Sequence, residues 1–321
     1  MIALLGASGY VGQALSEAMN RRAMPFLAVA RAEVDYASPS EFRNFLSRAR
    51  PTFVINAAGF TGKPNVDACE TRRAETLAGN SLLPLALAMA CAEANIPLGQ
   101  VSSGCIYSGS LVERDGAWTA EKNVNLPEVR RLALEAPHRL RGFDESIEPN
   151  FSFRDGPCSF YSGSKALGEE AIAGIGNQYV WRLRIPFNHC DGPRNYLSKL
   201  IRYERVYDAL NSLSHLDDFA EACLDCIVQK VPFGTYNVVN PGFVSAREVV
   251  DKIRLRFKLS REFSYWEGDQ EFYRVGATAL RSNCLLDSGK LLRAGVRLRS
   301  VGDALDDALE CWVPERATEL R

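Results

Sequence analysis

The sequence predicts an α/β fold built on a doubly wound parallel sheet, with a smaller mixed α/β lobe at its C-terminal end. Two observations carry this prediction. In the first half of the chain, short apolar runs alternate with amphipathic segments, as strands and crossover helices do in a parallel sheet. The first apolar run leads directly into a glycine-rich turn, Gly6 to Gly12, which is typical of the strand-to-helix turn of a Rossmann-type domain.

The predicted elements of the large domain follow one another with short connections. Strands are expected at 2–5, 26–30, 52–56, 98–102 and 179–183, and helices at 10–20, 39–48, 82–94 and in the segment through residue 165. Between Gly109 and Pro157 the periodicity fades and charges and prolines accumulate, which indicates an insertion with one helix around 126–134. We therefore predict a dinucleotide-binding domain over 1–185 that contains this insertion. The insertion is expected to flank the ligand site.

The C-terminal third has a mixed pattern. Helices are expected at 216–228, 246–257 and 301–312, and a short strand at 235–238. Residues 186–321 are thus predicted to form mostly a substrate-binding lobe, with some elements returning to the main domain. Because no internal repeat or low-complexity segment interrupts the chain, we expect one compact body.

Composition indicates a soluble protein with a large core, since 46% of the 321 residues are hydrophobic and the formal net charge is -1. The dispersed basic residues favour neither a nucleic acid nor a membrane partner, and no stretch is expected to span a bilayer. Nine irregularly spaced cysteines and the absence of a cleavable leader indicate the reducing cytoplasm. The pair Cys223 and Cys226 lies in a helical run without a second pair, and His189 and His215 lack a partner pattern, so we predict no metal site.

A dinucleotide cofactor is expected along two turns at the carboxyl edge of the sheet. The contacts come from the turn after the first strand and from the segment after the third strand: Gly6, Ser8, Gly9, Tyr10, Val11, Gly12, Asn56, Ala57, Ala58 and Gly59. The second strand ends at Arg31, with Glu33 and Asp35 only further on. Arg31 suits a 2'-phosphate, so we expect NADPH rather than NADH, with Asp35 as a further contact; a solvated arginine in a turn is the alternative.

Tyr161 and Lys165 carry the expected chemistry. Four residues apart on a helix, they share one face, so the ammonium is expected to favour the phenolate and to lower the pKa of Tyr161. Ser103 follows the fourth strand, at the sheet edge where ligands collect. We predict the reduction of a ketone in which Tyr161 donates the proton, Ser103 orients the oxygen and Lys165 also holds the nicotinamide ribose.

The order of these motifs resembles that of the extended short-chain dehydrogenase/reductases. More narrowly, five segments are similar to those of the nucleotide-linked 4-keto-rhamnose 3,5-epimerase/4-reductases: Asn56 to Asp67, Ser103 to Tyr107, Arg194 to Lys199, Asn240 to Gly242, and Arg281 to Asn283. Residues 111–150 depart from the shorter family pattern, which leaves the identity of the sugar open.

The resemblance implies reduction of a nucleoside-diphosphate 4-keto-6-deoxyhexose, with Cys105 and Lys199 as base and acid for epimerisation beside the ketone. If the segment is extended, Cys105 points to the same side as Ser103; an ordinary buried cysteine is the alternative. The expected substrate contacts are Lys63, Asn65, Ser103, Gly104, Cys105, Tyr161, Arg194, Asn195, Lys199, Arg202 and Arg281. A homodimer is expected by analogy alone.

Three other functions stay open at this point. A reductase or an epimerase alone would keep part of the same machinery. A 4,6-dehydratase on this fold would resemble its family in an Asp-Glu pair after the catalytic hydroxyl, where this chain has Gly104 and Cys105. A non-catalytic dinucleotide-binding regulatory subunit usually loses the tyrosine or the lysine, whereas this chain keeps Tyr161 and Lys165.

Overall fold

The computed structural model describes residues 1–315, and its centre is a six-stranded sheet whose strands are all parallel. From one edge to the other the strands are β13 (Gly234–Asn237), β8 (Gln178–Leu183), β4 (Leu98–Ser103), β3 (Phe53–Asn56), β1 (Ile2–Leu5) and β2 (Phe26–Val29). The strand order reverses between β1 and β3, so the crevice for a ligand is expected at their carboxyl ends.

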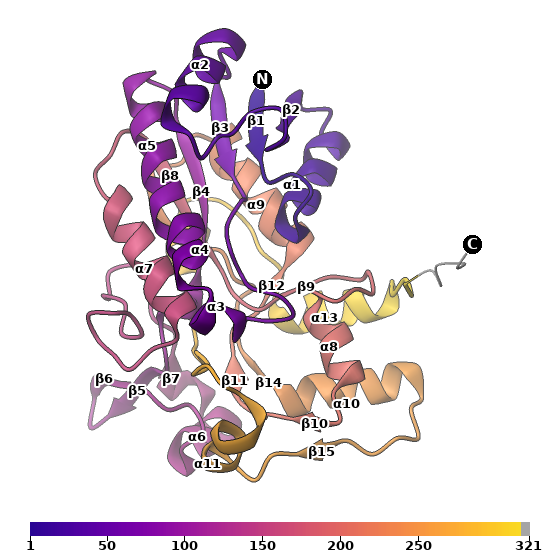
Figure 1. The fold of residues 1–321 in the computed structure, drawn as a ribbon. Helices are drawn as coiled ribbons and strands as arrows, with labels where there is room; N and C mark the ends of the chain where they lie inside the picture. Colours follow the sequence, from indigo (N-terminus) through magenta and orange to yellow (C-terminus); the bar gives the residue numbers. More distant parts are fainter. Residues whose placement is uncertain (316–321) are drawn as a thin grey trace.

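Helices cover both faces of this sheet, which confirms the predicted α/β class (Figure 1). One face carries α1 (Tyr10–Arg21) and α9 (Leu216–Val228), and the other carries α2 (Pro39–Ala49), α5 (Leu83–Glu93) and α7 (Phe160–Ile172). Alternate residues of β1 point to opposite faces of the sheet and enter two separate cores. Leu4 packs with α1 and α9, and Leu5 packs with α2 and α5. The buried Cys223 and Cys226 belong to the first layer, and all nine cysteines are free.

The helix before β4 is longer than the sequence predicts. A short helix, α3 (Ala68–Thr71), comes first. After it, α4 (Arg73–Leu77), a π-helical turn (Ala78–Leu82) and α5 together form one helix over Arg73–Glu93. By length and composition alone this helix could cross a membrane, contrary to our expectation for the chain. Half of its most apolar 18-residue stretch is buried inside the protein. Within the π turn, Asn80 bonds the backbone of Phe60 and the hydroxyl of Ser164. The irregular turn thus joins the loop after β3 to α7.

The insertion is more regular than its composition suggests. It contains the predicted helix, α6 (Pro127–Glu135), but also an antiparallel sheet of β6 (Ala117–Glu121), β5 (Ser110–Arg114) and β7 (Leu140–Arg141). Its two-residue hairpin turn is Asp115-Gly116, with φ of 52° and 77°. An Asp-Gly pair favours this turn because both residues must adopt positive φ, so a local signal for the hairpin was present in the sequence.

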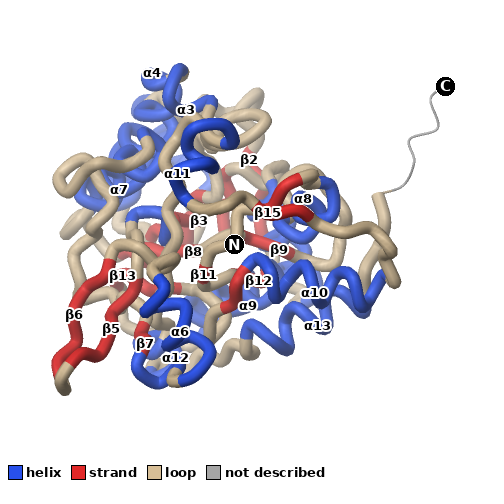
Figure 2. The backbone as a smooth tube through the Cα atoms, turned by 90° about the horizontal axis from the view of Figure 1, so that it is seen from below, coloured by secondary structure: helices blue, strands red, loops and turns tan. Residues whose placement is uncertain are grey.

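The insertion packs onto the C-terminal lobe and shares a core with it (Figure 2). Val112 and Leu132 from the insertion lie with Leu210 and Leu285 from the C-terminal lobe. The lobe has its own core around α8 (Tyr196–Arg202), α10 (Ala246–Phe257) and α13 (Val301–Glu310). Its remaining short elements are β9 (Pro186–Phe187), β10 (Arg205–Val206), β11 (Leu210–Asn211), β12 (Ser214–His215), β14 (Val244–Ser245), β15 (Ser264–Tyr265), α11 (Asp269–Glu271) and α12 (Gly289–Arg293).

The strand predicted at 235–238 is β13, which belongs to the main sheet rather than to the lobe. The helix α9 likewise returns to cover the main sheet. The last predicted helix ends at Glu310, two residues earlier than expected.

Candidate active site

The glycine turn between β1 and α1 is shaped by close packing of main chain on main chain. Gly6 has a φ of 75°, and a Cβ there would lie 2.6 Å from the amide nitrogen of Ala58. A Cβ on Gly12 would lie 2.0 Å from the carbonyl oxygen of Gly6. Ser8 and Gly9 are exposed where α1 begins, and within the described chain no side chain caps this helix. The first amides of α1 are therefore available to an anionic group.

The turn after β3 is the second wall of this crevice, and Asn56 shapes it. The buried Asn56 amide donates to Gln100 Oε1 at 2.8 Å, and its oxygen accepts from the Ala58 amide at 3.0 Å. A Cβ on Gly59 would lie 3.4 Å from the Lys165 ammonium. The crevice predicted to hold the cofactor therefore reaches the lysine predicted to work beside it.

Tyr161 lies in the first turn of α7 and is 8% exposed. Burial raises the pKa of its phenol, and a hydrogen bond with the Ser103 hydroxyl and the charge of Arg184 oppose that shift. Our expectation that Lys165 lowers the pKa of Tyr161 is therefore wrong, because removal from water outweighs the favourable charges. At neutral pH the side chain is a protonated phenol, which is the form that a proton donor needs.

Lys165 is buried one turn further along α7. Burial lowers its pKa to about 8, and the negative charge of Glu169 opposes the shift. Glu169 accepts from Ser102 at 2.5 Å and pairs with the buried Arg182 at 2.6 Å. Sequence reasoning missed Glu169, although it follows Lys165 by four residues and so belongs to the same helix face.

Cys105 also reaches this site, but not through the extended backbone that we expected. It lies in a 3-10 turn (Gly104–Ile106), and its amide donates to the Ser103 hydroxyl at 3.2 Å. Arg184, which is 1% exposed, donates to the Cys105 sulfur at 2.9 Å and to Asn211 Oδ1 at 2.5 Å. A guanidinium therefore faces the thiol, and Arg184 is a second residue that sequence reasoning missed.

The predicted cations of the lobe meet the loop that follows β3. Arg281 pairs with Asp67 through two contacts of 2.6 and 2.9 Å, and Arg194 donates to Thr61 Oγ1 at 2.8 Å. Burial, and then the charges of Arg194 and Arg281, lower the pKa of Lys199. Within residues 1–315 the Lys199 ammonium makes no hydrogen bond or ion pair. It is thus a partly desolvated cation without a protein partner in that range.

Two predicted substrate contacts are used by the fold instead. Asn195 is completely buried; its oxygen accepts from the Leu197 amide, and its amide group donates to carbonyls of the preceding loop. Arg202 forms ion pairs with Asp191 at 2.9 Å and with Glu315 at 3.4 Å. The prediction that these two side chains contact the substrate is therefore not supported by the geometry.

Four further predicted contacts are exposed side chains on loops. Arg31 follows β2, and its Nε lies 3.9 Å from Asp35 Oδ1. Lys63 and Asn65 lie on the loop after β3. The guanidinium of Arg31 also lies over the ring of the buried Tyr36, 5.4 Å from its centroid. The roles of these four side chains stay predictions.

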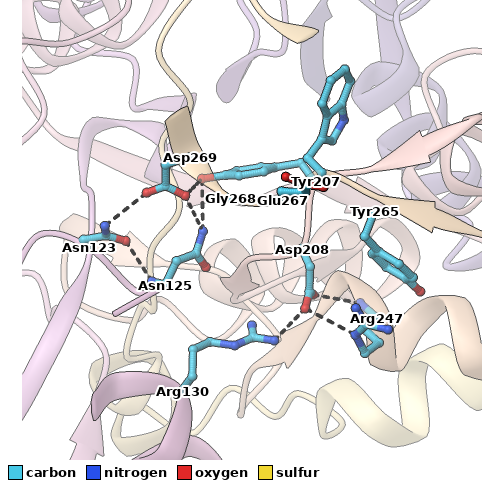
Figure 3. Close-up of a pocket in the computed structure, with 11 residues that line it drawn as sticks. Asn123, Asn125, Arg130, Tyr207, Asp208, Arg247, Tyr265, Glu267, Gly268 and Asp269 are labelled. Carbon is cyan, nitrogen blue, oxygen red and sulfur yellow. Dashed lines mark hydrogen bonds and ion pairs between the residues drawn. The ribbon is translucent and has the colours of Figure 1, made fainter. Parts of the chain in front are cut away.

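A polar pocket of about 320 Å³ opens between the insertion and the C-terminal lobe, and its lining includes none of the residues predicted to be catalytic (Figure 3). Asp269 accepts from Asn125 at 2.9 Å and from Tyr207 at 2.7 Å. Across the pocket, Arg130 pairs with Asp208 at 2.6 Å. These contacts join segments distant in the sequence, so no local pattern could have predicted the pocket.

Comparison with known proteins places this geometry among nucleotide-sugar enzymes. Residues 1–129 match the RmlD substrate binding domain family. A bifunctional dTDP-4-dehydrorhamnose 3,5-epimerase/dTDP-4-dehydrorhamnose reductase of Arabidopsis thaliana is 31% identical over 277 residues, which cover 86% of this chain and 81% of that protein. A trifunctional UDP-glucose 4,6-dehydratase/UDP-4-keto-6-deoxy-D-glucose 3,5-epimerase/UDP-4-keto-L-rhamnose-reductase of the same plant is 27% identical over 94% of this chain, which spans only 41% of that protein's length.

Among solved structures, the UDP-rhamnose synthase of Acanthamoeba polyphaga mimivirus has the same fold. The two superpose with a TM-score of 0.79 at 24% identity, over 97% of this chain and 99% of the viral one.

Proposed function

Because this chain belongs to the RmlD-like family of extended short-chain dehydrogenase/reductases, we propose that it reduces the 4-keto group of a nucleoside-diphosphate 4-keto-6-deoxyhexose. The observation that carries the proposal is the junction at Gly59, where the crevice beside the glycine turn reaches the Lys165 ammonium. The buried phenol of Tyr161 belongs to the same helix. The relatives act on UDP- and dTDP-linked 4-keto sugars, and this similarity supplies the class of substrate.

The residues present fit a dinucleotide. Backbone contacts at Gly6 and Gly12 leave no room for a side chain, and the exposed start of α1 offers free amides to a pyrophosphate. The exposed guanidinium of Arg31, with no carboxylate directly after β2, favours NADPH over NADH. Bound NADPH would supply the hydride.

The protein's own residues supply the proton and the orientation. Tyr161 holds its proton until the ketone oxygen gains charge and then donates it. Ser103, whose hydroxyl lies beside Tyr161, orients that oxygen. Lys165, while protonated, places a positive charge in a buried site, where it stabilises developing negative charge more strongly than it would in water.

We further propose that Cys105 and Lys199 exchange protons at the carbons beside the ketone. Such carbons are acidic, so a thiolate can remove a proton and an ammonium can return one. The hydrogen bond from Arg184 to the Cys105 sulfur and the unpaired ammonium of Lys199 within residues 1–315 support this proposal.

One incubation tests both activities. The protein is mixed with NADPH and a 4-keto-6-deoxy sugar linked to UDP or to dTDP, in deuterated water. Loss of NADPH absorbance measures reduction, and deuterium at the ring carbons beside the ketone measures epimerisation. We expect both signals, and we expect Cys105→Ala to abolish ring deuteration while the matched variant of the half-buried Cys158, Cys158→Ala, keeps it.

The outcomes separate the alternatives. Ring deuteration that survives in Cys105→Ala removes the epimerase assignment and leaves a reductase. If NADPH binds but neither nucleotide sugar is turned over, the chain is a binding or regulatory subunit.

The cofactor preference has its own test, which compares NADPH with NADH in the same reaction. We expect Arg31→Ala to raise the KM for NADPH and to leave the KM for NADH unchanged, with the exposed Arg48→Ala as control. A clear preference of the unaltered protein for NADH contradicts the proposal.

We also propose that the enzyme works in the cytoplasm as a homodimer. Leu82 and Met89 of the helix Arg73–Glu93 and Leu167 of α7 are exposed by 61, 45 and 40%, and these two helices pack side by side on one face of the sheet. Light scattering of the purified protein measures the assembly state, and a monomer at micromolar concentration contradicts this part.

A further inference from the structure

Two histidines and an aspartate converge beside α9, outside the proposed active site. His189 lies in the loop after β9, His215 belongs to β12, and Asp217 lies in the first turn of α9. The parallel pairing of β12 with β9 aligns His215 with Phe187 and so brings the segment of His189 close. One ligand atom from each of the three side chains lies within 4.8 Å of the other two, and His189 Nδ1 is 3.7 Å from Asp217 Oδ2.

His215 provides a second, independent observation. The residue is 2% exposed, and its Nδ1 faces Asp218 Oδ1 at 3.8 Å and Arg299 Nη2 at 3.4 Å. Its Nε2 is buried and has no hydrogen-bond partner among the described residues. Buried polar atoms are normally paired, so an orphaned ring nitrogen needs an explanation. Metal binding through Nε2 requires the imidazole proton on Nδ1, where it faces the Asp218 carboxylate, as is usual for a histidine bound to a metal. Because Arg299 can only donate, its contact with Nδ1 must then open, while its ion pairs with Asp218 and Asp307 remain.

We propose that His189, His215 and Asp217 bind one divalent transition-metal ion, with zinc as the preferred metal. Two imidazoles and one carboxylate form a common three-residue zinc ligand set, to which water adds the fourth ligand. Imidazole nitrogen disfavours magnesium and calcium, which prefer oxygen ligands.

The charges around the cluster are compatible with a cation. Arg21 lies 3.7 Å from Asp217 Oδ1, but it makes a closer contact of 2.9 Å with Glu221 and can stay there when Asp217 turns to an ion. Arg299, on the Nδ1 side of His215, is neutralised by ion pairs of 2.9 Å with Asp218 and 2.7 Å with Asp307.

An ion at this position would fix the loop between β9 and α8 to the main domain. The neighbouring Asn188 accepts from the Tyr10 hydroxyl, at the start of α1, at 3.1 Å. It also accepts from the amide of Asn195, which caps α8, the helix that carries Lys199. Although three protein ligands and a water are the set typical of catalytic zinc, this position joins a loop to the main domain, so we assign the ion a stabilising role that does not rest on the function proposed above. The competing interpretation is a half-exposed ion pair between His189 and Asp217 beside a histidine that packs on Phe187.

The test uses the full chain, freed of metal with EDTA and titrated with Co²⁺ and then with Zn²⁺. We expect one equivalent of Co²⁺ with the intense visible absorbance of four-coordinate cobalt, displacement of that cobalt by Zn²⁺, and a zinc-dependent rise in Tm. The partly exposed His189→Ala and Asp217→Asn should weaken binding by at least about 10-fold and remove the rise in Tm. The third histidine of the chain, His138, is exposed, so His138→Ala is the control.

Since His215→Ala removes a buried side chain, circular dichroism must first show that this variant folds, and the two milder variants carry the conclusion if it does not. Absence of stoichiometric binding by the unaltered protein overturns the proposal. Equal binding by His189→Ala, Asp217→Asn and the unaltered protein also overturns it, because the ion is then held elsewhere.

Discussion

The two ends of the proposed active site are built by different means. Where the cofactor is proposed to lie, contacts between backbone atoms decide the shape: Gly6 packs on Ala58, and Gly12 packs on Gly6. At the substrate end, long charged side chains decide it, as in the pair of Arg281 with Asp67. The backbone contacts at the cofactor end leave no room for added atoms. At the substrate end, a charged side chain can exchange its protein partner for an oxygen of the ligand. Substitutions should therefore act on folding and cofactor binding at one end and on substrate affinity at the other.

Tyr161 lies where the two ends meet, so its loss should have the largest effect. We expect Tyr161→Phe to lower kcat for reduction by about 10²- to 10⁴-fold, because the ring remains but the proton donor is lost. Affinity for NADPH, measured by the quenching of protein fluorescence, should stay within a few-fold. The matched control is Tyr236→Phe, which removes the hydroxyl of another buried tyrosine. Reduction by Tyr161→Phe at the parental rate would exclude the proposed proton donor.

Gly12→Ala tests the backbone-built end. The added methyl group would lie 2.0 Å from the Gly6 carbonyl, so the turn must shift, and we expect a loss of about 1–3 kcal/mol in the free energy of unfolding together with loss of NADPH binding. Gly302→Ala, in α13, is the control, since its methyl group would meet only Ser300 Oγ at 3.8 Å. That variant should be as stable as the parent or gain up to about 1 kcal/mol. Denaturant unfolding compares them, and equal stability of both variants would contradict the packing argument.

Arg281→Ala tests the side-chain-built end. A charged hydrogen bond contributes about 1.5–3 kcal/mol, so the KM for the nucleotide sugar should rise by roughly 10- to 100-fold with little change in kcat. Asp67→Asn separates the possible causes, because it weakens the ion pair and leaves the arginine in place. If Asp67→Asn raises KM as much as Arg281→Ala does, the pair only holds the loop, and Arg281 does not contact substrate.

A smaller effect, on the pH dependence of the reaction, is expected from changing the surroundings of Lys165, the buried cation between the two ends. Because its pKa is about 8, kcat/KM for reduction should fall as pH rises through that value and the ammonium loses its proton. Glu169→Gln removes a charge that favours the protonated form, so the falling limb should move to lower pH. Glu170→Gln, at an exposed neighbour, should leave the profile unchanged. A shift to higher pH in Glu169→Gln would contradict the electrostatic argument.

The comparison also explains what could be predicted from the sequence. The glycine turn, the parallel strands and the positions of Tyr161 and Lys165 follow from local spacing. Most predicted elements lie within a few residues of those in the structure; the helix predicted at 82–94 is an exception, because it begins at Arg73. Arg184 could not be assigned to the site in this way, because its importance depends on which strand packs beside Cys105. Glu169 could have been, because it follows Lys165 by four residues on the same helix. Local spacing also gave the wrong sign for the pKa of Tyr161, since burial is a property of the whole fold.

The hairpin of β5 and β6 is missing from the prediction for a different reason. Its Asp115-Gly116 turn is a local signal, but the charged residues around it were interpreted as irregular structure.

The shared core of the insertion and the C-terminal lobe has a consequence for synthesis. Phe143 bridges to Leu286, and Val112 packs with Leu285, so the finished hairpin stays without its partners until roughly 160 more residues have been synthesised. At about 5–20 residues per second, the apolar side of the nascent strands stays uncovered for roughly 8–33 s. During that interval it is a natural target for a chaperone, and slower translation of the second half of the message should lengthen the exposure and lower the yield of folded protein.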